Sequence, residues 1–214
     1  MEFQDAVRRR RMVRRFAPDP IPDEVLISIL ETAQHAPSAG FAQGLEMVVL
    51  DDPGQLNSFW ELVDPQSRKH GARRPSLDER SDVQVRMPSF EGDPPVVVIP
   101  YSGKPHYLER YSQPDKHAFG MGTEEGWPVP YWDIDAAMGV MLMLLAAVDE
   151  GVGGWFFGIF QGEAELTRWL GVPEGFRAIG AVALGYPSPE ERRRGSVLTR
   201  GRRPLKDVVH YGGW

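Results

Sequence analysis

Cysteine is absent from the 214 residues of this chain. Disulfide bonds, thiolate nucleophiles and cysteine metal sites are therefore excluded, and the reducing cytoplasm is a permitted compartment. The first residues run straight into charge without an apolar stretch, so no secretory signal peptide is visible. From these absences we expect a cytoplasmic protein.

A hydrophobic run long enough to span a membrane is also missing. The longest uncharged, apolar-rich stretch lies between Asp135 and Asp149 and has thirteen residues, whereas a span needs about 20. This stretch predicts a buried core helix over about 132–150, and no membrane contact. Because the helix is apolar nearly all round, it needs cover on every side, and a subunit interface would provide it.

Several common catalytic motifs are absent as well. The chain has no Gly-x-x-x-x-Gly-Lys-Ser/Thr loop and no Gly-x-Ser-x-Gly elbow. The segment GVGGWF (151–156) shares only two glycines with a dinucleotide fingerprint and follows a helix instead of a strand. The five histidines show no metal-ligand spacing, so we expect no metal site.

The elements that the sequence does predict mix helices with strands. Residues 103–130 are rich in Gly, Pro and aromatics and predict a long irregular loop, and 76–87 carry only a weak helical signal. The element order predicts one α+β domain with a sheet sandwiched by helices. Apolar spacing indicates helices near 3–10, 22–36, 132–150 and 163–170, and strands near 45–50, 94–101, 153–160 and 178–186.

Basic residues are outnumbered overall but crowded at one place. The chain carries 24 Lys and Arg against 30 Asp and Glu, yet six arginines fall within Arg8–Arg15. Without them 18 basic side chains face 30 acidic ones, which argues against a general nucleic-acid binder. Three interpretations remain open: a solvated helix end, an arm that binds nucleic acid, or a clamp for a cofactor phosphate.

A second arginine group favours the clamp. Arg200, Arg202 and Arg203 lie near the C-terminal end, where Gly201 allows the backbone to turn. Two groups from opposite ends of the chain could converge on one phosphate. The segment APSAGFAQG (36–44) adds hydroxyl and backbone donors among small residues, as a flat ring lying against main chain requires.

These segments, in this order and spacing, resemble the FMN-dependent nitroreductase family. The resemblance covers residues 1–51 and 131–210, whereas about 55–130 matches poorly. It rests on RRRRMVRRF (8–16), APSAGFAQG, DIDAAMGVMLMLLAAVDEGVGGWFFGIF (133–160), LGVPEGFRAIGAVALGYP (170–187) and RGRRPLKDVV (200–209).

The resemblance implies a nitroreductase-like fold, with a central, mostly antiparallel sheet sandwiched by helices. It implies one domain over 1–214, with a variable lid region at about 55–130 and a partner-wrapping tail at about 190–214. The family further implies an intertwined homodimer with FMN at the interface. NADH or NADPH would reduce flavin N5 and leave, and a nitroaromatic or quinone would then take the electrons in a ping-pong reaction.

The resemblance also assigns residues to the flavin phosphate and its neighbourhood. Arg10 and Arg11 would hold the phosphate and ribityl end, and Arg14 would lie near the pyrimidine edge, where positive charge stabilises the reduced anion. Met12 stands where the family usually has Ser, which removes one expected ribityl hydrogen bond. The tail's basic pair on the phosphate would be Arg200 and Arg202.

Two further segments would line the ring. In the segment 36–44, Pro37, Ser38 and Ala39 would contact the ring and ribityl chain of the flavin. Phe41 and Gln43 would reach the flavin site of the partner subunit. A backbone donor to flavin N5 and O4 would come from Phe157 or Gly158, with Phe156 beside it. No side chain is expected to act as an essential acid or base.

Other functions stay open at this point. One relative cleaves its own flavin to build dimethylbenzimidazole, but such enzymes carry Asp at the position of Met12 and Ser at that of Phe157. A flavin-binding protein with little turnover is a second alternative. A third is a protein without flavin, in which Arg8–Arg15 bind nucleic acid.

Overall fold

A computed structural model of the chain describes residues 1–64, 94–192 and 196–214. Its centre is one sheet in which every strand pairing is antiparallel, with the order β1-β2-β5-β3, and β4 paired to β2. All eight residues of β2 are buried, as its position in the middle of the sheet requires. The strands are β1 (Leu45–Leu50), β2 (Val96–Gly103), β3 (Gly153–Phe157), β4 (Phe176–Ala178) and β5 (Ala181–Gly185).

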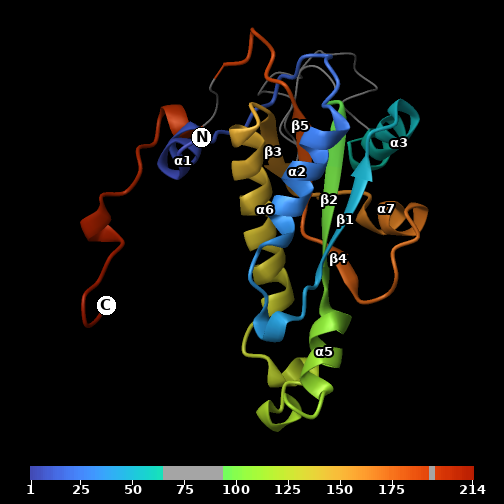
Figure 1. Ribbon diagram of the computed structural model, residues 1–214, viewed down its shortest axis with the longest axis vertical. Coiled ribbons are helices and arrows are strands. Elements are labelled where there is room, and N and C mark those ends of the chain that lie inside the picture. The colour runs from blue at the N-terminus through green and yellow to red at the C-terminus, as the bar shows by residue number, and fades with distance from the viewer. Residues whose placement is uncertain (65–93, 193–195) are drawn as a thin grey trace, which may run out of the picture.

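One face of the sheet is covered by two helices that lie side by side (Figure 1). They are α2 (Asp23–Gln34) and α6 (Tyr131–Asp149). Val96 and Val98 of β2 point to this face and pack with Ile29 of α2 and Met143 of α6. The alternation of side chains along β2 sends the intervening residues to the opposite face.

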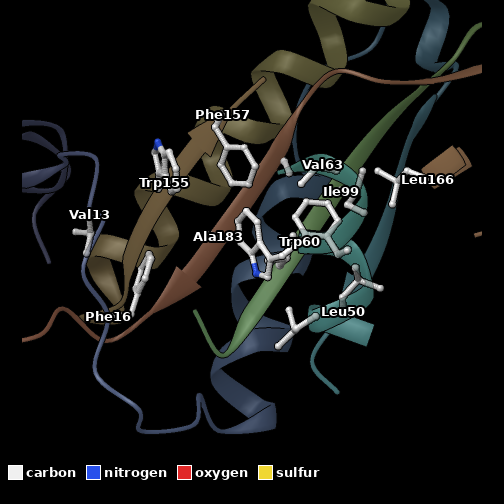
Figure 2. Close-up of a cluster of buried hydrophobic side chains, with 14 of the residues drawn as sticks. Val13, Phe16, Leu50, Trp60, Val63, Ile99, Trp155, Phe157, Leu166 and Ala183 are labelled. Carbon is white, nitrogen blue, oxygen red and sulfur yellow. The ribbon is translucent and has the colours of Figure 1, made fainter. Parts of the chain in front are cut away.

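The other face is covered by α3 (Pro53–Val63) and α7 (Glu163–Trp169) (Figure 1). Figure 2 shows its core, in which Trp60 of α3 lies beside Phe157 of β3 and Ile99 of β2. The Trp60 and Phe157 rings are stacked, with centroids 5.6 Å apart. Helices on both faces confirm the predicted sandwich and the α+β class.

The N-terminal segment lies on the outer edge of β3. It begins with α1 (Phe3–Arg9), after which Met12 forms a parallel bridge to Gly154. The Val13 N–H donates to the Gly154 carbonyl at 3.0 Å, and Figure 2 shows Val13 beside the strand that carries Trp155. A Cβ on Gly153 would lie only 2.8 Å from Val13, so glycine allows this close approach. The arginine-rich segment is thereby tied to the sheet.

Two helices depart from the sequence predictions. The prediction that 103–130 is irregular was wrong for α5 (Lys104–Ser112), and α3 was missed altogether. Asp52 caps α3 by accepting from the Gly54 and Gln55 N–H groups, with Pro53 in the first turn. Asp-Pro-Gly is common in turns, although the same residues also start helices. The weak helical signal at 76–87 lies outside the described residues.

The helix α6 is only half covered within one chain. By length and composition it could cross a membrane, with 44% of its apolar window buried, but soluble core helices pass the same test. Ile134, Met138 and Met141 are exposed and recur at helical spacing, so they share one face.

The tail at 196–214 contains only short 3-10 turns at Ser196–Leu198 and Leu205–Asp207, and runs away from the sheet (Figure 1).

Candidate functional site

Arg10 lies at the end of α1 and is partly buried. Its backbone N–H donates to the Ala6 carbonyl at 2.9 Å, so the residue caps the helix. Its Nη1 atom is buried and has no hydrogen-bond partner. A buried donor without a partner costs about 1–3 kcal/mol, and more when charged. The donor chemistry of this atom fits an anionic oxygen such as that of a phosphate.

Arg11 is engaged by a protein carboxylate instead. Its Nη1 donates to Glu191 Oε1 at 3.1 Å, and the Glu191 side chain is only 2% exposed. The neighbouring Arg15 pairs with Glu190 at 2.6 Å, so both arginines fasten the segment to the chain that follows β5. The predicted phosphate role of Arg11 stays a prediction, and in this structure its charge already has a partner.

Arg14 and Met12 lie along β3. The Arg14 guanidinium stands over the Trp155 ring, 5.6 Å from its centroid. Met12 packs against the cores on both faces of the sheet. The segment therefore lines the start of β3 with one apolar and one cationic side chain.

The end of β3 faces two different environments. Phe157 is 4% exposed and belongs to the core that contains Trp60, so its side chain is a packing residue. Phe156 points to the opposite face and lines a cavity. Gly158 comes directly after the strand, and a Cβ there would meet the Phe160 ring at 2.8 Å.

The cavity beside Phe156 has a volume of about 520 Å³, within the range of small-molecule sites. One wall carries an ion pair between Asp133 and Arg177, and the buried Ser102 hydroxyl donates to Asp133 Oδ1 at 2.7 Å. The other lining residues are Ala137, Glu163, Ala178 and Ile179. The cavity thus combines an apolar floor with charged groups of both signs.

The loop that follows α2 has an unusual backbone. Gly40, Phe41 and Gln43 all have positive φ, at 60°, 57° and 52°. This conformation costs roughly 1–2 kcal/mol for a residue other than glycine. Nevertheless Phe41 is 74% exposed, and Gln43 N–H donates to Ser38 Oγ at 3.0 Å. A strained loop that displays a large apolar side chain is typical of a contact surface.

Comparison with known proteins decides the family. The family model described as "Nitroreductase family" matches residues 7–186, which include the arginine segment, the loop and the cavity. The chain belongs to the nitroreductase family.

Relatives and solved structures agree with this assignment. An NADH dehydrogenase of Thermus thermophilus is 29% identical over 192 residues, covering 89% of each chain. An iodotyrosine deiodinase of Nematostella vectensis is 23% identical over 209 residues, 97% of this chain and 74% of that protein. The fold matches a crystal structure of oxidized iodotyrosine deiodinase bound to FMN and 3-iodo-L-tyrosine. There the TM-score is 0.68 and the identity 19%, over 99% of this chain and 100% of the other.

Within this chain the predicted site residues fall into separate groups. Arg10–Arg14 and β3 lie together near the C-terminal end of α6, where the Met1 amino group pairs with Asp149. The Pro37–Gln43 loop lies at the N-terminal end of α6, where Ala39 N–H bonds Asp135. Asp135 and Asp149 are about 21 Å apart along the helix axis. One chain therefore does not bring the loop to its own arginines (Figure 1).

The tail arginines lie at the surface. Arg200 and Arg202 are exposed, in a tail that extends away from the sheet in Figure 1. Among the described residues, no group of three His, Asp or Glu could hold a metal ion.

Sequence reasoning missed the residues that hold the loop and the ion pair in the cavity. Asp135 is buried on α6, accepting from Ala39 N–H and from the Tyr107 hydroxyl. An acidic residue at the start of so apolar a helix was the signal that could have identified it, since buried carboxylates need partners. Arg177 and Tyr107 carried no comparable signal.

Proposed function

We propose that this chain is an FMN-dependent NAD(P)H oxidoreductase of the cytoplasm that acts as a homodimer on a nitroaromatic, quinone or related small acceptor by a ping-pong mechanism. The observation that carries the proposal is the buried, unpartnered Arg10 Nη1 beside β3, in a chain of the nitroreductase family. Two supporting observations are the FMN in a solved protein of the same fold and the name of the NADH dehydrogenase relative.

The residues of this chain would bind and orient the cofactor. Arg10 would donate to the phosphate, and Arg14 would add positive charge beside the pyrimidine edge. Phe156 would form an apolar wall, and the backbone at Phe157 or Gly158 would donate a hydrogen bond to the ring. When bound, FMN supplies the ability to accept a hydride and pass its electrons on.

Homodimer formation would complete the site. The exposed face of α6 offers Ile134, Met138 and Met141 as an apolar surface, and burial of such side chains drives association. The loop with Phe41 would then reach the partner's flavin, because it lies too far from the arginines of its own chain. The tail with Arg200 and Arg202 would wrap the partner and place its basic pair near the phosphate.

The flavin-cleaving alternative is not supported by the residues present. Met12 packs in the core and Phe157 is 4% exposed, so neither position offers a polar group for that chemistry. A flavin protein with little turnover would reduce an acceptor slowly or not at all. The rate of acceptor reduction therefore distinguishes this alternative from our proposal.

An absorbance spectrum of the purified protein tests the proposal. We expect flavin bands that bleach when NADH or NADPH is added without oxygen and return when menadione or a nitrofuran follows. Bleaching without acceptor-dependent turnover would favour the binding protein. A colourless protein that takes up no FMN on incubation would refute the proposal, and steeply salt-dependent DNA binding would then favour a nucleic-acid arm.

A further inference from the structure

We propose that Asp135, together with Tyr107 and Arg110, is a positioning device that holds the 38–43 loop in its strained conformation for the flavin site of the partner subunit. The inference rests on the proposed function for its purpose. Its geometry is independent of that function. It gives the segment around α5 a role as a brace for the loop, in contrast to the expected lid.

Asp135 binds the backbone at the beginning of the loop. Its carboxylate is 7% exposed, and Oδ2 accepts from Ala39 N–H at 2.8 Å and from the Tyr107 hydroxyl at 2.9 Å. One buried oxygen thus joins α6, the loop and α5. Tyr107 is fully buried, and its ring packs closely against Gly44 at the far end of the loop, where a Cβ would lie 2.4 Å from the ring.

Burial, reinforced by the hydrogen bond to Asp135, raises the pKa of the Tyr107 hydroxyl far above its usual range. The hydroxyl therefore keeps its proton and remains a donor to Asp135 at every pH at which the protein is handled.

Arg110 binds the backbone in the middle of the loop. Its Nε donates to the Gly40 carbonyl at 2.9 Å, while Asp115 holds the other side of the guanidinium with two bonds of 2.8 and 2.7 Å. The Tyr111 ring closes the space above, because a Cβ on Gly40 would lie 2.8 Å from it. Arg110 and Tyr111 of α5, together with Asp115 just after the helix, therefore fix the position of the loop backbone.

The loop needs such support because its backbone is strained, although three hydrogen bonds within 38–43 already form a 3-10 turn there. Three of its residues have positive φ, two of them not glycine, and a conformation of this kind persists only where its surroundings enforce it. Phe41 itself is exposed and cannot anchor the loop by burial. Without Asp135 and α5, the backbone would relax and Phe41 would change its direction.

Three variants and one control test this inference. Asp135→Ala removes the acceptor, Tyr107→Phe removes one donor, and Asp135→Asn keeps an oxygen that can accept from Ala39 N–H. Tyr101→Phe is the matched control, since Tyr101 is equally buried but belongs to the core on the other face of the sheet, and its hydroxyl has no hydrogen-bond partner among the described residues. Each variant is measured for amide hydrogen exchange over residues 38–43 of the apoprotein, for melting midpoint, and for the FMN Kd by flavin fluorescence.

We expect Asp135→Ala to raise the FMN Kd by about tenfold and to speed exchange at Ala39. Tyr107→Phe should have the same effects to a smaller extent, and Asp135→Asn should recover most of the wild-type Kd. Tyr101→Phe removes a buried hydroxyl that has no hydrogen-bond partner in the described residues, so it should leave the melting midpoint unchanged or raise it, with no change in the Kd or in the exchange of the loop.

Opposite results would overturn the inference. Unchanged loop exchange in Tyr107→Phe would refute the brace even if Asp135→Ala fails to fold. An equal rise of the Kd in Tyr101→Phe would overturn the inference, because the effect would then come from removing any buried tyrosine hydroxyl and not from the bond to Asp135. If the wild-type protein binds no FMN, the proposed function fails, and the exchange data still decide whether the brace exists.

Discussion

Replacing Arg10 by alanine should have opposite effects on the apoprotein and on its complex with FMN. In the apoprotein the buried Nη1 has no partner, and an unsatisfied buried donor costs about 1–3 kcal/mol. Removing it should leave the free energy of unfolding unchanged or raise it by up to that amount. For a chain of this length each kcal/mol corresponds to roughly 2–4 °C in melting midpoint.

The bound state should respond in the other direction. A hydrogen bond to a charged group contributes about 1.5–3 kcal/mol, so its loss should raise the FMN Kd by roughly 10- to 150-fold. The FMN Kd of Arg10→Lys should lie between those of the wild type and of Arg10→Ala, because lysine keeps the charge but not the planar arrangement of donors.

Thermal melting of the apoprotein and a flavin fluorescence titration measure both quantities. Arg8→Ala is the control, since that side chain is 72% exposed, and neither quantity should change. A melting midpoint that falls in Arg10→Ala while the Kd stays constant would refute the reasoning, because the guanidinium would then be a structural group.

Three further predictions follow from contacts elsewhere in the chain. Gly153→Ala places a Cβ 2.8 Å from Val13 and should lower the free energy of unfolding by about 1–3 kcal/mol in denaturant; an unchanged midpoint would contradict this packing. Met141→Lys on the exposed face of α6 should give monomers in light scattering, whereas Trp169→Lys, on α7 across the sheet, should remain dimeric. Burial raises the pKa of Tyr101 to about 12, while the unfolded tyrosine ionises near 10. The unfolded state therefore loses its proton first, stability should fall between about pH 10 and 12, and Tyr101→Phe should show a shallower fall in alkaline denaturation.

Much of the fold could be predicted because its signals are local. The run around β2 is apolar on both faces, and the α6 region is long and apolar with aspartates at its beginning. Such patterns follow from the period of each element and need no knowledge of distant residues.

The prediction was wrong where local signals were ambiguous. In α5 the buried residues are tyrosines, Tyr107 and Tyr111, within a segment rich in charge, so no apolar stripe is visible. In α3 the Asp-Pro-Gly start is shared by turns and helices. Only packing against the sheet and the loop separates these possibilities.

The sequence by itself determined which chemical groups are available: arginines to meet an anion, no thiol, and a helix too apolar to stand alone. The tertiary structure decided which of them are free to act. It left Arg10 Nη1 buried without a partner, turned Arg11 toward Glu191, and set Asp135 under the loop. The physical reason is that burial and pairing of a charge depend on side chains far away in the sequence, which no local pattern records; Arg11 and Glu191 are separated by 180 positions.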